Sequence, residues 1–174
     1  MYRRRSLAAA VAMAAPLLLG LRSTAMAQQD TLQNQLVGSW ALISIRTTRP
    51  DGSVYGPFGP QETDTLLFER NGRFALILIN PDTPKYAVNN RENPTSQEAM
   101  ATAKASFDFF GSYSVNEPDH TFVFHVEASS FPNFAGTDQK RVIKSLTPSE
   151  LVFVNFTPPD GGGNTVKLTY RRIE

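Results

Sequence analysis

Eight short strand-like segments, separated by turn signals, constrain the fold of this chain most. Each is rich in β-branched and aromatic residues, and nearly all the connections are of hairpin length. Consecutive hairpins give an antiparallel sheet, and eight strands can close into an up-and-down barrel that holds one small ligand. The sequence therefore predicts an all-β barrel. The segments cover residues 36–48, 64–69, 73–79, 109–115, 121–127, 139–146, 150–156 and 165–173.

Two connections carry specific turn signals. Asn71-Gly72 lies between the second and third segments and is the dipeptide that best tolerates the two positive φ angles of a type I′ hairpin turn. The glycines at 161–163 precede a strand-like segment rather than a helix. They predict a hairpin loop, because a phosphate-binding loop requires a helix N-terminus after it.

One segment, residues 93–107, has helical character and is inserted between strands three and four. Thr95 is followed three residues later by Glu98, which is the pattern of a capping box. A weak apolar stripe at helical spacing follows. We expect one helix that either closes a barrel mouth or packs on the outer wall.

The N-terminal segment has the features of a secretory signal peptide. Three arginines at positions 3–5 precede an Ala-rich apolar run over residues 6–21 and a small-x-small site at 25–27. A membrane anchor is disfavoured because Pro16 interrupts the run and the run is short. We expect cleavage after Ala27 and a single exported domain, 28–174, in the periplasm or secreted.

Composition excludes several classes of function for residues 28–174. They hold 13 basic and 16 acidic residues, so no basic surface points to nucleic acid. Residues 28–174 contain no second apolar span, so we do not expect stable membrane insertion. We also expect a monomer. The chain has no cysteine and only two histidines, which disfavours thiol chemistry and a zinc site. No cofactor motif is present, so we expect none.

The first and last strands carry a family resemblance. Gly38 and Trp40 form a Gly-x-Trp motif on the opening strand, which resembles the signature of the lipocalins. There the Trp plugs the closed barrel end, and an Arg of the last strand packs across its ring. The resemblance implies that Arg171 or Arg172 makes this cation–π contact here.

A closer resemblance is to the bacterial and fungal lipocalin-like domain family, a calycin-like eight-stranded barrel. It is carried by "LVGSW", "PFG", "FFGSYSV", "HVEASSFPNFAGTDQKR" and the closing "YRR", and it covers essentially all of 36–172. Most members of this family have no assigned biochemical activity. The resemblance therefore implies the fold more than the function.

The block at 125–141 carries the candidate functional residues. His125 and Glu127 share one face of a strand. Antiparallel pairing across the 128–138 loop is expected to bring Glu127 near Gln139, and His125 near Arg141. If that face is interior, a polar cluster results, which Tyr113 could join. The predicted ligand-binding residues are Tyr113, His125, Glu127, Gln139 and Arg141.

Several functions remain open for this cluster. It could be a self-satisfied network that fixes strand register, or it could face solvent. It could bind a ligand, with Arg141 and His125 meeting a carboxylate or carbonyl. As a cofactor-free isomerase or cyclase, His125 or Glu127 would transfer protons and Arg141 would stabilise an oxyanion. Ser129 and Ser130 lie near His125, but without a nucleophile elbow a hydrolase is disfavoured.

The prediction that follows is an exported barrel that binds a small, largely apolar molecule. An alternative is a barrel filled by its own side chains, which would have a structural or interaction role.

Overall fold

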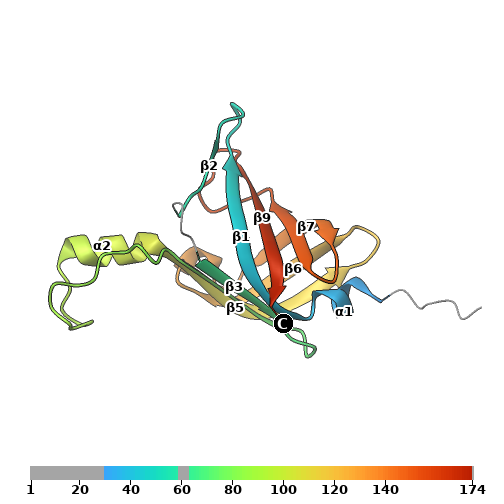
Figure 1. The fold of residues 1–174 in the computed structure, drawn as a ribbon, viewed down its shortest axis with the longest axis horizontal. Coiled ribbons are helices and arrows are strands. Elements are labelled where there is room, and N and C mark those ends of the chain that lie inside the picture. Colours follow the sequence, from blue (N-terminus) through green and yellow to red (C-terminus); the bar gives the residue numbers. More distant parts are fainter. Residues whose placement is uncertain (1–29, 59–62, 174) are drawn as a thin grey trace, which may run out of the picture.

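The chain forms a closed antiparallel barrel in a computed structural model that describes residues 30–58 and 63–173 (Figure 1). The sheet order is β2-β1-β3-β4-β5-β6-β7-β8-β9, and β1 also pairs with β9, which closes the barrel. Eight of these strands match the eight predicted segments, so the predicted fold class is confirmed. The strands are β1 (Gly38–Thr48), β2 (Val54–Tyr55), β3 (Thr63–Phe68), β4 (Arg73–Ile79), β5 (Ser106–Asn116), β6 (Thr121–Ser129), β7 (Asp138–Leu146), β8 (Glu150–Asn155) and β9 (Thr165–Ile173).

The two-residue strand β2 was not expected. It folds back on the end of β1, with Thr47 opposite Tyr55. Because β2 is counted, the inserted helix α2 (Ser96–Ala105) lies between β4 and β5 and not between β3 and β4. The expected position between strands three and four is corrected accordingly.

The β3–β4 hairpin forms as expected, but with a different turn. Of the two central residues only Gly72 has a positive φ, 81°, whereas a type I′ turn needs positive φ at both. The Gly72 N–H donates to the carbonyl of Glu69. Gly72 therefore serves as the single left-handed residue at the end of a longer turn.

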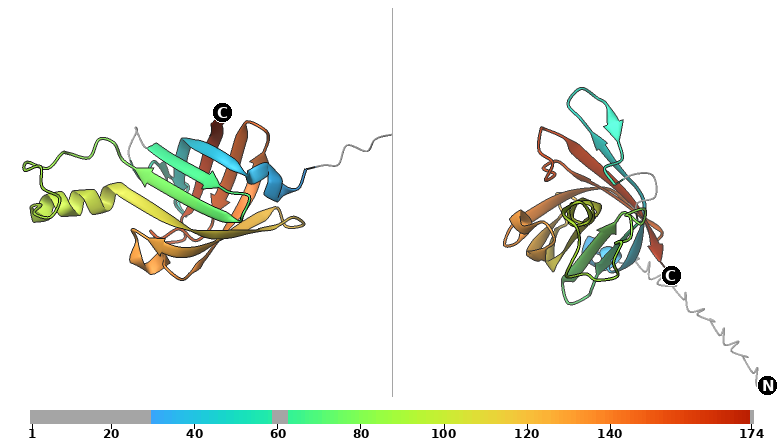
Figure 2. Two further views of the ribbon diagram at one scale, coloured as in Figure 1. Left: turned by 90° about the horizontal axis from the view of Figure 1, so that it is seen from below. Right: turned by 90° about the vertical axis from the view of Figure 1, so that its left-hand side faces the viewer.

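Helix α2 neither closes the mouth nor packs on the wall. Its capping box is formed, since the Thr95 hydroxyl accepts from the Glu98 N–H and the Glu98 carboxylate accepts from the Thr95 N–H. No residue of the helix is buried. Figures 1 and 2 show it on an arm that extends β5 away from the barrel. Both expected placements are wrong, because the apolar stripe is too weak to hold the helix on a surface.

Strand alternation fills the barrel with aromatic rings. On β6, Phe122, Phe124 and Val126 point inward and are almost fully buried. Phe68 of β3 packs on Phe122 and Phe124 with ring centroids 5.5 and 5.8 Å apart. This cluster fills the half of the barrel next to the short helix α1 (Leu32–Leu36).

The end of the barrel next to α1 is closed by Trp40 and Arg172. Trp40 is fully buried, and its indole N–H donates to the Leu36 carbonyl at 2.8 Å. The Arg172 guanidinium lies 4.0 Å from the centre of the Trp40 ring system. A Cβ at Gly38 would come within 2.5 Å of the Arg172 side chain, and Gly38 has φ of 136°. The Gly-x-Trp motif thus works with Arg172 and not with Arg171.

The predicted signal peptide lies outside the described residues. Within the described ranges, no helix is both long and apolar enough to span a membrane.

Candidate functional site

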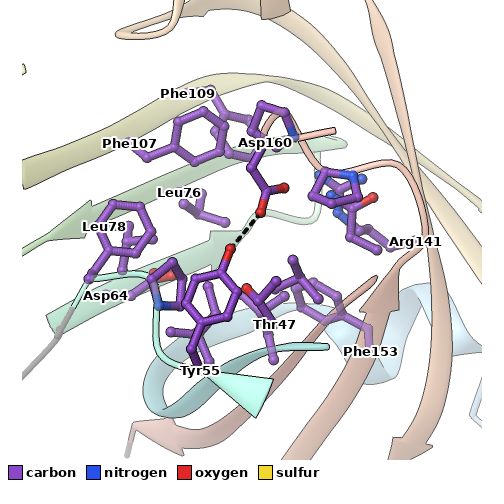
Figure 3. A pocket seen from close by; sticks show the side chains of 18 residues that line it. Thr47, Tyr55, Asp64, Leu76, Leu78, Phe107, Phe109, Arg141, Phe153 and Asp160 are labelled. Atoms are coloured by element: carbon purple, nitrogen blue, oxygen red, sulfur yellow. Dashed lines mark hydrogen bonds between the residues drawn. The ribbon is translucent and has the colours of Figure 1, made fainter. Parts of the chain in front are cut away.

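A cavity of about 290 Å³ occupies the half of the barrel where β1 meets β2 (Figure 3). Its size is at the lower end for small-molecule sites. The barrel is therefore not completely filled by its own side chains. Most of its wall is apolar, and the apolar residues from the strands are Ile45, Leu76, Leu78, Phe107, Phe109, Phe153, Val166 and Leu168.

Arg141 is the only cationic residue in the described part of the cavity wall. It comes from β7 and is 4% exposed. One guanidinium nitrogen donates to the backbone carbonyl of Lys140 at 2.9 Å, and the group lies 5.6 Å from the centre of the Phe124 ring. Among the described residues it forms no ion pair. Burial lowers the pKa of Arg141 to about 10, so the group is still charged at neutral pH.

Asp64 is an acidic residue buried in the same wall. It is 2% exposed, and its Oδ2 accepts a hydrogen bond of 2.6 Å from the buried Tyr170 hydroxyl. Burial raises the pKa of Asp64 to about 7, an increase that the Tyr170 hydrogen bond partly offsets and the charge of Asp108 reinforces. The Asp64 Oδ1 atom and the Thr47 hydroxyl, both buried, have no hydrogen-bond partner in the described structure.

The mouth of the cavity is bridged by one hydrogen bond. The Tyr55 hydroxyl of β2 donates to Asp160 Oδ2 in the β8–β9 loop at 3.0 Å, and Figure 3 shows this contact across the opening. The guanidinium of Arg49 lies 4.0 Å from the Tyr55 ring centre. Pro57, Phe58, Pro158 and Pro159 complete this rim. The predicted hairpin loop at 161–163 therefore follows directly on the rim of the site.

The predicted polar cluster does not assemble, because its expected register is wrong. His125 lies opposite Asp138 and not Arg141, and Arg141 lies opposite Phe122. The shift between the expected and observed partner of His125 is three residues. An odd shift moves side chains to the other face of the sheet. Arg141 therefore points inward, whereas His125 and Glu127 lie on the outer surface.

The remaining predicted residues also separate. Tyr113 is 6% exposed in the aromatic core, and its hydroxyl donates to the Glu69 carbonyl. The Gln139 amide donates to the Thr137 hydroxyl in the loop before β7. Only Arg141 of the five predicted ligand-binding residues lines the cavity. The barrel wall also separates Arg141 from His125 and Glu127, so these three cannot act on one substrate as the enzyme alternative required.

The outer surface of β5, β6 and β7 holds two polar contacts instead. Glu127 pairs with Arg73 of β4, and the second contact of this bidentate pair is 2.9 Å long. His125 Nδ1 is 2.6 Å from Asp138 Oδ1, and His125 Nε2 is 2.9 Å from the Ser114 hydroxyl. These residues belong to a different face from the cavity.

Sequence reasoning missed Asp64, Thr47 and Tyr55. A signal existed for Asp64, because it alternates with the buried Leu66 and Phe68 on one strand and must share their inward face. No comparable signal existed for Tyr55, since it lies on the unexpected strand β2.

The family model of the lipocalin-like domain matches residues 37–173. No protein with a curated description matches. Bovine odorant-binding protein in complex with its natural ligand is 16% identical, with 84% of this chain and 76% of that chain covered and a TM-score of 0.41. A redesigned β-barrel is 14% identical, with 84% and 98% covered and a TM-score of 0.44.

Proposed function

This chain belongs to the lipocalin-like domain family, and we propose that its barrel binds a small, largely apolar molecule whose acidic group pairs with Arg141. The single observation that carries the proposal is a buried guanidinium that faces a cavity and has no anionic partner among the described residues. Burying a charge without a partner is costly. A carboxylate in the cavity would offset that cost through bidentate hydrogen bonds.

The rest of the wall suits the apolar body of such a ligand. Leucine, isoleucine and phenylalanine side chains surround the cavity, and burial of a ligand's hydrocarbon against them stabilises the complex by roughly 25 cal/mol per Å². The cavity volume limits this body to a small molecule.

Asp64 and Thr47 provide a second polar position. Their unpartnered oxygens accept hydrogen bonds, and the Asp64 carboxyl becomes a donor when it is protonated, which its pKa of about 7 allows near neutral pH. A ligand that carries a hydroxyl group in addition to its acid would satisfy these atoms. Such a molecule would bind more tightly than the plain acid.

The test compares octanoate with 1-octanol, two probes of equal chain length, by titration calorimetry. We expect the wild-type protein to bind octanoate at least tenfold more tightly than octanol. In Arg141→Met the preference should disappear or reverse, because the cation is lost while the apolar wall stays. Lys140→Met is the matched control, since Lys140 precedes Arg141 but is exposed.

Native mass spectrometry of the purified protein gives an independent test. A co-purified acidic molecule that is present in the wild type and absent from Arg141→Met supports the proposal. Equal binding of both probes in wild type and variant would contradict it. A folded protein that binds neither probe and carries no ligand would instead favour a structural or interaction role.

Export belongs to the same proposal and is supported by the N-terminal sequence alone. Sequencing the N-terminus of protein recovered from outside the cytoplasm should give Gln28 as the first residue.

A further inference from the structure

We propose that Ser114, His125 and Asp138 form a serine nucleophile with its general base on the outer surface of the barrel, and that this site reacts with activated esters. The three residues lie on the adjacent strands β5, β6 and β7. The inference is independent of the cavity, because the barrel wall separates this surface from Arg141.

The geometry assigns a role to each atom. Asp138, when ionised, can only accept hydrogen bonds, so the 2.6 Å contact requires a proton on His125 Nδ1. In the neutral imidazole, Nε2 is then an acceptor. The Ser114 hydroxyl must therefore donate to Nε2 across 2.9 Å. This arrangement is the nucleophile, base and orienting carboxylate of serine hydrolases.

Strand register holds the three groups together without a loop. Ser112, and not Ser114, lies directly opposite His125 on β5, and Asp138 lies directly opposite it on β7. The imidazole therefore reaches along β5 to the hydroxyl two residues further on. His125 is paired on both sides, with Ser112 of β5 and Asp138 of β7. Ser114 and Asp138 are each on a strand paired with β6, so β6 fixes the relative positions of the three groups.

The reaction that follows is acyl transfer. The Ser114 oxygen attacks the ester carbonyl carbon while its proton moves to His125 Nε2. The C–O bond to the alcohol then breaks, and His125 returns the proton to the leaving oxygen. Water attacks the acyl-serine by the same route and releases the carboxylic acid and free Ser114.

The surroundings limit the substrates. The backbone of His125 is paired on both sides, so its N–H is not free to form an oxyanion hole. The side chains of His125 and Asp138 are 41% and 70% exposed. The general base alone contributes roughly 10²–10⁴-fold to a rate. Esters with good leaving groups are therefore within reach, whereas amides are not.

The test uses p-nitrophenyl acetate and a fluorophosphonate probe, with peptide mapping of the labelled protein. We expect the phosphonyl group on Ser114, and labelling about 100-fold slower in His125→Gln, in line with the loss of a general base. Ser114→Ala should lose the adduct. Ser112→Ala is the matched control, since it removes a serine on the same face of the same strand and should label normally.

Asp138 acts through His125 and is a positioning residue. Asp138→Asn should slow labelling, and Asp138→Glu should restore part of the rate, which a purely structural role would not predict. Arg141→Met should be labelled at the same rate as the wild type, because Arg141 lies in the cavity and not at this surface site. Failure of the cavity proposal can therefore be told apart from failure of this one. Labels spread over many surface residues, or a rate unchanged in His125→Gln, would overturn the inference.

Discussion

The two ends of the barrel each hold a partly or fully buried arginine, and the two arginines differ in how well they are satisfied. At the closed end, Arg172 donates to the carbonyls of Pro148, Val37 and Gln35 at 2.6–2.7 Å and stacks on Trp40. At the open end, Arg141 is more deeply buried, but among the described residues it makes a single hydrogen bond, to a neighbouring backbone carbonyl.

The difference indicates that Arg172 stabilises the fold, whereas the charge of Arg141 has no anionic partner among the described residues. The hydrogen bonds of Arg172 tie the last strand to the segment before β1 and to the β7–β8 turn. Within the described residues, Arg141 makes no hydrogen bond to a distant segment, and its burial opposes folding unless an anion pairs with it. The more deeply buried of the two arginines therefore has the fewer hydrogen-bond partners among the described residues.

The largest effect should come from the closed end. Arg172→Met removes three charge-assisted hydrogen bonds and leaves three carbonyl groups without them. We expect the free energy of unfolding to fall by about 3 kcal/mol in urea denaturation. Arg171→Met, which changes the exposed neighbour, should alter it by less than about 0.5 kcal/mol. If both variants lost the same free energy of unfolding, the hydrogen bonds of Arg172 would not be what stabilises the closed end.

Arg141→Met should behave in the opposite way. Replacing a buried, unpaired cation by an apolar side chain of similar length is expected to leave the free energy of unfolding unchanged or to raise it by about 1 kcal/mol. The same urea measurement, made on ligand-free protein, checks this. A loss as large as that of Arg172→Met would mean that Arg141 has a structural role.

Asp64 should make the stability of the barrel depend on pH. Its folded pKa of about 7 lies above the unfolded value of 3.8, so the folded state binds the proton more tightly. The stabilisation that protonated Asp64 contributes to the folded state is therefore fully present below pH 4 and is lost as pH rises through 7. Between pH 5 and 8 we expect a loss of roughly 2 kcal/mol that is absent in Asp64→Asn, measured by thermal unfolding against pH.

The smallest effect should come from the mouth. Tyr55→Phe keeps the ring over which Arg49 lies but removes the hydrogen bond to Asp160. Because this bond is exposed, it contributes about 0.5–1 kcal/mol at most. We expect octanoate to dissociate two- to fivefold faster in stopped-flow experiments, with little change in stability. An unchanged dissociation rate would show that the ligand leaves by another route.

Local patterns predicted the strands, the capping box and a closure of the barrel end by Trp40 with either Arg171 or Arg172. Each depends on alternation, on a short spacing or on the family resemblance. They failed where the outcome depends on register. The loop between β6 and β7 determines whether His125 meets Asp138 or Arg141, and its sequence does not give the number of paired residues.

A different limit hid the serine on β5. The pairing of β5 with β6 is regular from Asn116 to Gly111, and it places Ser112 opposite His125. The imidazole contacts Ser114 instead, two residues further along the strand, and strand alternation does not predict which of the two serines it meets. The candidate site was found only in part, because Arg141 was identified but the cavity partners Asp64 and Thr47 were not.

The pairing of β1 with β9 has a consequence for how the chain is made. The contacts that close the barrel join Ser39 to Ile173, almost the whole described length apart. Contacts of such high sequence separation slow folding, and closure cannot occur until the last strand has been synthesised. Until then β1 and β8 each present an unpaired edge, so a growing or truncated chain is at its most prone to aggregation just before completion.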